Sequence, residues 1–147
     1  MTHKSDGIAR RIEPFQGREL DAHYLAYFDC FNRGLFFEAH DVLEALWLSQ
    51  RGGSNHAFHK GLIQLAGAFV HLQKDRLRPS SSLFKLAAMN LKQYPAIHES
   101  LDVAGVIKLI EQWERRLEES GFTSNPLQVF GAPKLGLENV RDAKNLV

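Results

Sequence analysis

Apolar residues recur at helical spacing in five segments of this chain, and no segment alternates apolar and polar residues as a half-buried strand would. The five segments are residues 19–32, 36–50, 55–72, 82–94 and 102–120. Glycine, proline or serine residues separate them, as is usual where helices begin and end. Because 44% of the 147 residues are hydrophobic, the chain can bury one well-filled core. The pattern predicts an all-α fold, a compact bundle of about five helices in a single domain, residues 1–147.

The turns between these segments predict how the helices connect. Glycine-rich residues 51–54 join the second and third segments, and so short a connection indicates an antiparallel helical hairpin at the centre of the fold. Pro79 is expected to end the stretch of chain before it, and the serines at 80–82 offer caps for the fourth helix. Two prolines and two glycines exclude a long helix further on, so residues 122–147 are expected to form an extended, irregular strap with a short terminal helix. Residues 1–16 are expected to be flexible.

The overall charge argues against several classes of partner. Lys and Arg total 18 against 17 Asp and Glu, so the net charge is +1 and offers little attraction to nucleic acid or an acidic membrane. The longest apolar run, residues 61–70, is shorter than the roughly 20 residues that cross a bilayer, and no secretory signal is visible. The single cysteine, Cys30, lies among aromatic residues, which is typical of a buried thiol in a reducing compartment. We therefore expect a cytoplasmic protein without a nucleic-acid or membrane partner.

Two ionisable residues stand out because they fall on an apolar face. In segment 36–50, helical spacing turns His40 and Glu44 toward the apolar side that carries Trp47. Ionisable groups in such surroundings are costly unless something satisfies them. His40 and Glu44 are therefore the first residues in which to look for function.

The expected hairpin brings polar residues of the third segment to the same level. If residue 50 faces residue 55 across the turn, Gln64 lies one helical step from His40 and Glu44. His71 lies further along the same stripe of the third segment, where the small residue Gly61 would let a neighbouring helix approach closely. We therefore expect His40, Glu44, Gln64 and His71 to form a buried polar cluster between two tightly packed helices.

This cluster has several interpretations, which the residues leave open. As a binding site, it belongs to a helical binding or scaffold module that takes a small molecule or a protein partner. As a catalytic site, it belongs to a small-molecule enzyme, hydrolytic or metal-assisted, in which His40 is the general base, Glu44 orients it and Gln64 holds the substrate. An internal hydrogen-bond network that fixes the helix register would also satisfy these groups.

The sequence indicates no cofactor. His40 and Glu44 are four residues apart and could supply two ligands to a divalent metal, which is a further alternative. The zinc-protease pattern, however, needs a second histidine where Glu44 stands, and the repeated Glu-x-x-His of di-iron bundles is absent. We therefore assign no metal ligands.

Glu38 and Trp47 belong to the same segment but have simpler structural interpretations. Glu38 falls opposite the His40 face, in the first helical turn, where a carboxylate stabilises the positive end of the helix. The hairpin also places His71 level with Glu38, so Glu38 and His71 could form an ion pair. Trp47 is expected in the core, with its indole N–H bonded to an acceptor.

Residues of about 20–94 resemble a known family. The resemblance lies in residues 31–40, in Leu43, Glu44 and Trp47, and in residues 61–66 with His71. These stretches are similar to the family described as domain of unknown function 309, a group of small all-helical proteins. The resemblance implies a helical bundle, and it implies no activity because none is assigned to the family. It also implies that a set of six residues matters, and we take these as the candidate ligand-binding residues: Glu38, His40, Glu44, Trp47, Gln64 and His71.

Overall fold

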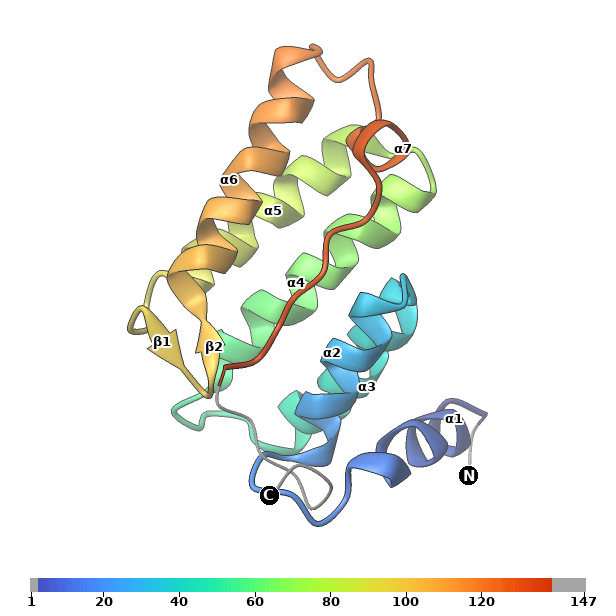
Figure 1. The fold of residues 1–147 in the computed structure, drawn as a ribbon, viewed down its shortest axis with the longest axis vertical. Helices are drawn as coiled ribbons and strands as arrows, with labels where there is room; N and C mark the ends of the chain where they lie inside the picture. Colours follow the sequence, from blue (N-terminus) through green and yellow to red (C-terminus); the bar gives the residue numbers. More distant parts are fainter. Residues whose placement is uncertain (1–2, 139–147) are drawn as a thin grey trace.

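Seven helices, one short 3-10 helix and one two-stranded hairpin make up residues 3–138, the part of the chain that the computed structural model describes (Figure 1). In chain order they are α1 (His3–Ile12), η1 (Glu13–Phe15), α2 (Ala22–Asn32), α3 (Phe36–Ser49), α4 (His56–Gln73), α5 (Leu77–Leu91), β1 (Ile97–His98), β2 (Leu101–Asp102), α6 (Val103–Glu119) and α7 (Pro126–Phe130). The predicted all-α bundle is confirmed. No helix among the described residues has the length and apolarity needed to cross a membrane.

Helices α3 and α4 form the predicted antiparallel hairpin, and hydrogen bonds mark both of its ends. Near the turn, the Trp47 indole Nε1 donates to the carbonyl of His56 at 3.1 Å. At the open end, Gln73 Nε2 donates to the carbonyl of Gly34 at 3.1 Å. Gly34 has a φ of 75°, the left-handed conformation that lets α2 end and α3 begin within a few residues. Helix α5 then packs along α4, and α6 packs on α5 (Figure 1).

The core contains a group of aromatic rings around Phe69 of α4. Its ring stacks on Phe36 at 4.9 Å between centroids and meets Trp113 edge-on at 4.9 Å. Phe31 and Phe84 make edge-on contacts at 5.5 and 5.3 Å. Each of these side chains is buried. Residues of α2, α3, α5 and α6 therefore meet on one side chain of α4.

The predicted close approach to the small residues of α4 occurs at Gly61, where the neighbour is α5. A Cβ atom built on Gly61 would lie 2.9 Å from Leu91 Cγ and 3.1 Å from the carbonyl oxygen of Ala87. A Cβ on Gly67 would meet Leu83 Cδ1 at 3.1 Å, which is the mobile end of a half-buried side chain. The two glycines of α4 therefore differ in how much space surrounds them.

We expect Gly61→Ala to destabilise the protein and Gly67→Ala to stabilise it. Alanine in place of glycine inside a helix gains about 1 kcal/mol of helix propensity. At Gly61, overpacking against α5 costs about 1–3 kcal/mol and outweighs that gain, whereas at Gly67 the Leu83 side chain can turn away. Urea denaturation should show a net loss for the first variant and a gain of up to about 1 kcal/mol for the second. Equal changes for both variants would contradict the packing described here.

Helix α5 begins earlier than expected. Pro79 is expected to end the stretch of chain before α5, but it lies in the first turn of that helix. N–H groups in a first turn have no partner within the helix, so the missing N–H of proline costs no hydrogen bond there. The serines at 80–82 are therefore inside the helix and do not cap it. Ser80 is buried, and its Oγ donates to the carbonyl of Ala68 at 2.9 Å. That bond links α5 to α4.

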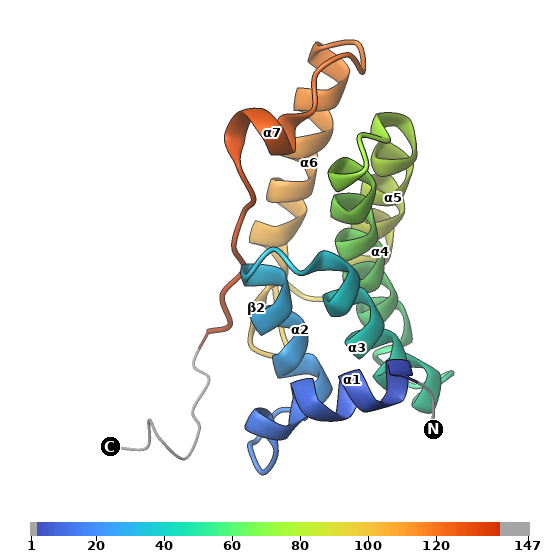
Figure 2. The same cartoon turned by 90° about the vertical axis from the view of Figure 1, so that its right-hand side faces the viewer.

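The two ends of the chain also differ from the prediction in part. Residues 3–15, expected to be flexible, form α1 and η1, and Figure 2 shows α1 across one end of α2 and α3. Ile8 and Ile12 lie one helical turn apart and pack against the core, which explains why a helix forms there. Residues 126–130, expected to be part of the extended strap, form the short helix α7 instead, and the extended segment after it returns toward β2, where Leu137 pairs with Leu101. The predicted terminal helix falls in residues 139–147, outside the described residues.

Candidate ligand-binding groove

A groove of about 320 Å³ lies on the face of the bundle formed by α3, α4 and α5, and we call it the α4 groove. Its polar lining residues are His40, Glu44, Lys60, Gln64 and His71. Its remaining lining residues are Phe37, Ile63, Gly67, Val70 and Leu83. Four of the six candidate residues named from the sequence, His40, Glu44, Gln64 and His71, thus line one groove.

The hairpin explains why the charged lining residues lie at one end of the groove and mainly apolar residues lie at the other. On α4, residues from Lys60 to His71 follow each other at three- and four-residue intervals and form one stripe. On α3 the stripe runs the opposite way, so Glu44 lies toward Lys60 while Phe37 lies toward the far end. Leu83 of α5 adds an apolar wall. The charged residues are therefore gathered near the hairpin turn.

The expected burial of this cluster is wrong. The side chains of His40 and Glu44 are 31% and 30% exposed, and Gln64 and His71 are also only half-buried. The helical wheel correctly places these residues on one face, but it does not show whether another helix covers that face. Here the groove is open to solvent, with Leu83 of α5 as the third wall.

His40 is oriented by a residue other than the one expected. Its Nδ1 lies 3.2 Å from Asp41 Oδ1, within hydrogen-bonding distance, whereas its Nε2 is 4.0 Å from Glu44 Oε2. Asp41, not Glu44, is therefore the carboxylate that contacts the His40 ring most closely. Asp41 is not expected as a partner from the sequence, because adjacent helical residues normally diverge.

Lys4 of α1 neutralises the carboxylates beside His40. Its Nζ lies 3.0 Å from Glu44 Oε1 and 3.5 Å from Asp41 Oδ1. Burial raises the pKa of Glu44, but the hydrogen bond from Lys4 and the charges of His40, Lys4 and Lys60 together lower that pKa below its usual value. The hydrogen bond to Glu44 also raises the pKa of Lys4. Glu44 is thus ionised and already paired.

Gln64 and His71 complete the polar lining. Asn90 of α5 donates from Nδ2 to Gln64 Oε1 at 2.7 Å, which fixes the orientation of the Gln64 amide. Burial lowers the pKa of His71, and the charges of Arg76 and Lys74 lower it further, so the ring is neutral near pH 7. Its Nδ1 is buried and has no hydrogen-bond partner among residues 3–138.

The other two candidate residues lie outside the groove. Glu38 does not line it, and its carboxylate makes an ion pair of 4.0 Å with Arg11 of α1 in place of the proposed pair with His71. Trp47, expected in the core, is only half-buried beside the hairpin turn. Its N–H does find an acceptor, the carbonyl of His56, and Lys60 Nζ lies 4.5 Å from the centroid of its ring. Trp47 therefore supports the groove by holding Lys60.

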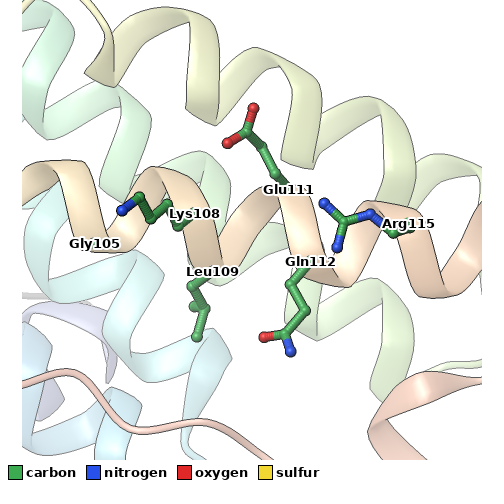
Figure 3. A pocket seen from close by; sticks show the side chains of 6 residues that line it. All are labelled: Gly105, Lys108, Leu109, Glu111, Gln112 and Arg115. Carbon is green, nitrogen blue, oxygen red and sulfur yellow. The ribbon is translucent and has the colours of Figure 1, made fainter.

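Other features of the described residues are weaker candidates. The hollow shown in Figure 3 has a volume of about 450 Å³, but all its lining residues belong to α6 and their side chains spread apart along that helix. His40, Asp41 and Glu44 offer ligand atoms within 4.8 Å of one another, as a metal site would. Because Lys4 already binds both carboxylates, we assign no metal there.

The fold and the groove define a small all-α bundle with a polar cleft beside a helical hairpin. The model of the family described as domain of unknown function (DUF309) matches residues 24–83. The resemblance inferred from the sequence is thereby confirmed over this segment, which contains every residue that lines the α4 groove. No curated protein and no solved structure shows significant similarity to the chain.

Proposed function

We propose that this protein is a helical binding module that holds a small molecule in the α4 groove. The observation that carries the proposal is the convergence of charged side chains and Gln64 at one end of a groove whose other end is mainly apolar and holds the uncharged His71. Its volume of about 320 Å³ falls at the lower end of the range of ligand pockets, about 300–1,000 Å³. Such pockets combine apolar walls with a few placed polar groups.

The unpaired nitrogen of His71 supports a site built for binding. A buried polar atom without a hydrogen bond costs about 1–3 kcal/mol, and native proteins rarely keep one without a functional reason. His71 Nδ1 is such an atom, and its ring forms a wall of the groove. Contact between the His71 ring and a ligand would explain why the protein keeps this unpaired nitrogen.

A second candidate function is catalysis with His40 as general base. The hydrogen-bond distance between His40 Nδ1 and Asp41 favours it, because a general base is usually oriented by a further group. In this reading Asp41 is the orienting carboxylate, and the reaction is hydrolytic or metal-assisted. The lining of the groove supplies no serine, threonine or cysteine nucleophile, so in this second candidate function His40 would activate a water molecule.

The proposal includes a cytoplasmic location and no partnership with nucleic acid or membrane. The near-zero net charge and the single cysteine support it. Cys30 is free and buried, as is usual in a reducing compartment.

Blocking the groove should abolish ligand binding. A leucine at Gly67 would project beside Leu83, whereas an alanine adds a single methyl group there. We expect a fragment library, titrated into ¹⁵N-labelled protein, to shift amide signals of the groove residues. Each fragment should bind at least about tenfold more weakly to Gly67→Leu, a loss of about 1.4 kcal/mol, and nearly normally to Gly67→Ala.

Three outcomes would contradict this proposal. Fragments could bind Gly67→Leu as tightly as the parent, or shift signals of the α6 hollow instead. The molecular mass in solution could also change on Gly67→Leu substitution, which would make the groove a contact between copies of the chain.

A further inference from the structure

We infer that the ligand of the α4 groove is an amphipathic anion, a small carboxylate whose head lies by Lys60 and Gln64 and whose apolar tail lies along Gly67. This inference rests on the proposed function and adds the chemical class of the ligand. It follows from the charges at the polar end of the groove, from the hydrogen-bond donors there and from the shape of the apolar end.

Lys60 is the charged residue of the groove that lacks an ion pair among residues 3–138. Its ammonium group lies over the Trp47 ring, at 4.5 Å from the centroid. That ring is held in place by its hydrogen bond to the carbonyl of His56. Glu44, in contrast, is paired with Lys4 at 3.0 Å. The charge of Lys60 helps to lower the pKa of Glu44, but its ammonium has no carboxylate at ion-pair distance within residues 3–138, so a bound anion would meet a positioned cation there.

The neighbouring amide favours the same ligand charge. Asn90 already donates to one lone pair of Gln64 Oε1, whereas the Gln64 Nε2 amide, which only donates hydrogen bonds, makes none within residues 3–138. A carboxylate accepts hydrogen bonds from an ammonium and from an amide at the same time. An ammonium ligand would meet donors at both positions. It would also have to displace Lys4 before it could reach the Glu44 and Asp41 carboxylates.

The apolar end of the groove suits a hydrocarbon tail. Gly67 has no side chain, and Ile63, Val70 and Leu83 line the space around it. At 1.5 Å per residue, the stripe of α4 from Lys60 to Val70 is about 15 Å long, which leaves room for a tail of several carbons. His71, whose pKa is lowered by burial, adds no positive charge at this end. One charged head and one uncharged tail therefore match the two ends.

The test uses four probes that separate the head from the tail: sodium octanoate, 1-octanol, octylammonium chloride and sodium acetate. Binding is measured by NMR titration of the full chain and of Lys60→Ala, Lys60→Arg and Lys108→Ala. Lys108 is the matched control, because it is an exposed lysine on α6. We expect octanoate to bind about tenfold more tightly than octanol, because its head makes charge-assisted hydrogen bonds. Acetate should bind still more weakly because it has no tail to bury.

In Lys60→Ala, octanoate should lose its advantage over octanol, while octanol binding stays unchanged. Lys60→Arg should keep the preference, and Lys108→Ala should behave as the parent. Octanol or octylammonium binding as tightly as octanoate would overturn the anionic head. An equal loss of octanoate and octanol in Lys60→Ala would also overturn it, because the lysine would then act through packing.

The same titrations distinguish this inference from the proposed function. If fragments bind the groove but none of the four probes does, the ligand class is wrong and the binding function remains. If octanoate binds Gly67→Leu as tightly as the parent, it binds elsewhere, and both proposals fail.

Discussion

Replacing Phe69 with alanine is expected to lower the free energy of unfolding by about 4 kcal/mol, because the large cavity left in the core cannot close fully. Phe69 is fully buried and touches four other aromatic rings, which come from α2, α3, α5 and α6. No single helix can move inward to fill the space without leaving its other neighbours. Urea denaturation followed by far-UV circular dichroism measures the change.

Two control variants separate the loss of packing from the loss of an aromatic residue in general. Phe69→Leu keeps most of the volume and should cost less than about 1.5 kcal/mol. Phe37→Ala removes a phenylalanine that is 56% exposed and should cost less than about 0.5 kcal/mol. A loss below about 2 kcal/mol in Phe69→Ala would show that the core can collapse around this position, contrary to the packing described.

The helices of this fold could be predicted because their limits depend on local chemistry. Gly34 adopts the left-handed conformation at the end of α2, and the side chain of Asp102 accepts a hydrogen bond from the Gly105 amide at the start of α6. The start of α5 was harder to predict, because Pro79 is compatible both with a break and with a first helical turn. Ile8 and Ile12 gave too short a pattern to predict α1, which depends on packing against α2 and α3.

The α4 groove was partly predictable for the same reason. The length of the hairpin turn sets which residues of α3 and α4 are level, so the sequence brings Gln64 and His71 to the side of His40 and Glu44. Whether a third helix covers these residues depends on the path of α5, which no local pattern specifies. Lys4 could not be found at all, because it reaches Glu44 across forty residues of sequence.

Two asparagines show a further limit of prediction from sequence. Asn32 holds the C-terminal strap by donating from Nδ2 to the Leu135 carbonyl and accepting from the Leu135 amide, both at 2.7 Å. From the sequence alone, Asn32 is interpreted only as part of the turn that ends α2. Asn125 caps α7 and also reaches the end of α4. Hydrogen bonds from a side chain to a distant backbone leave no periodic signal, so such residues emerge only from the structure.

Asn125→Ala should cost about 2–3 kcal/mol of stability, the second large effect that we expect. The side chain is only 5% exposed and makes three hydrogen bonds. Its Nδ2 donates to the Leu72 carbonyl at 2.6 Å and to Asp75 Oδ1 at 3.1 Å, and its Oδ1 accepts from the Leu127 amide at 3.0 Å. Alanine removes the helix cap and the hydrogen bonds to the Leu72 carbonyl and the Asp75 carboxylate, although the Leu72 carbonyl keeps the Asp75 amide as a donor.

Asn125→Asp tests the donor separately from the cap. An aspartate still accepts from the Leu127 amide, but it cannot donate to Leu72, and its charge would lie beside the Asp75 carboxylate. We therefore expect it to be at least as unstable as Asn125→Ala at pH 7. Repulsion from Asp75 raises the folded-state pKa of the new carboxyl, so the destabilisation is present at high pH and relieved as the pH falls through that pKa. Urea denaturation at pH 7 and pH 4 should show that Asn125→Asp becomes more stable relative to Asn125→Ala in acid, and an unchanged difference would mean that the new carboxylate is not repelled by Asp75.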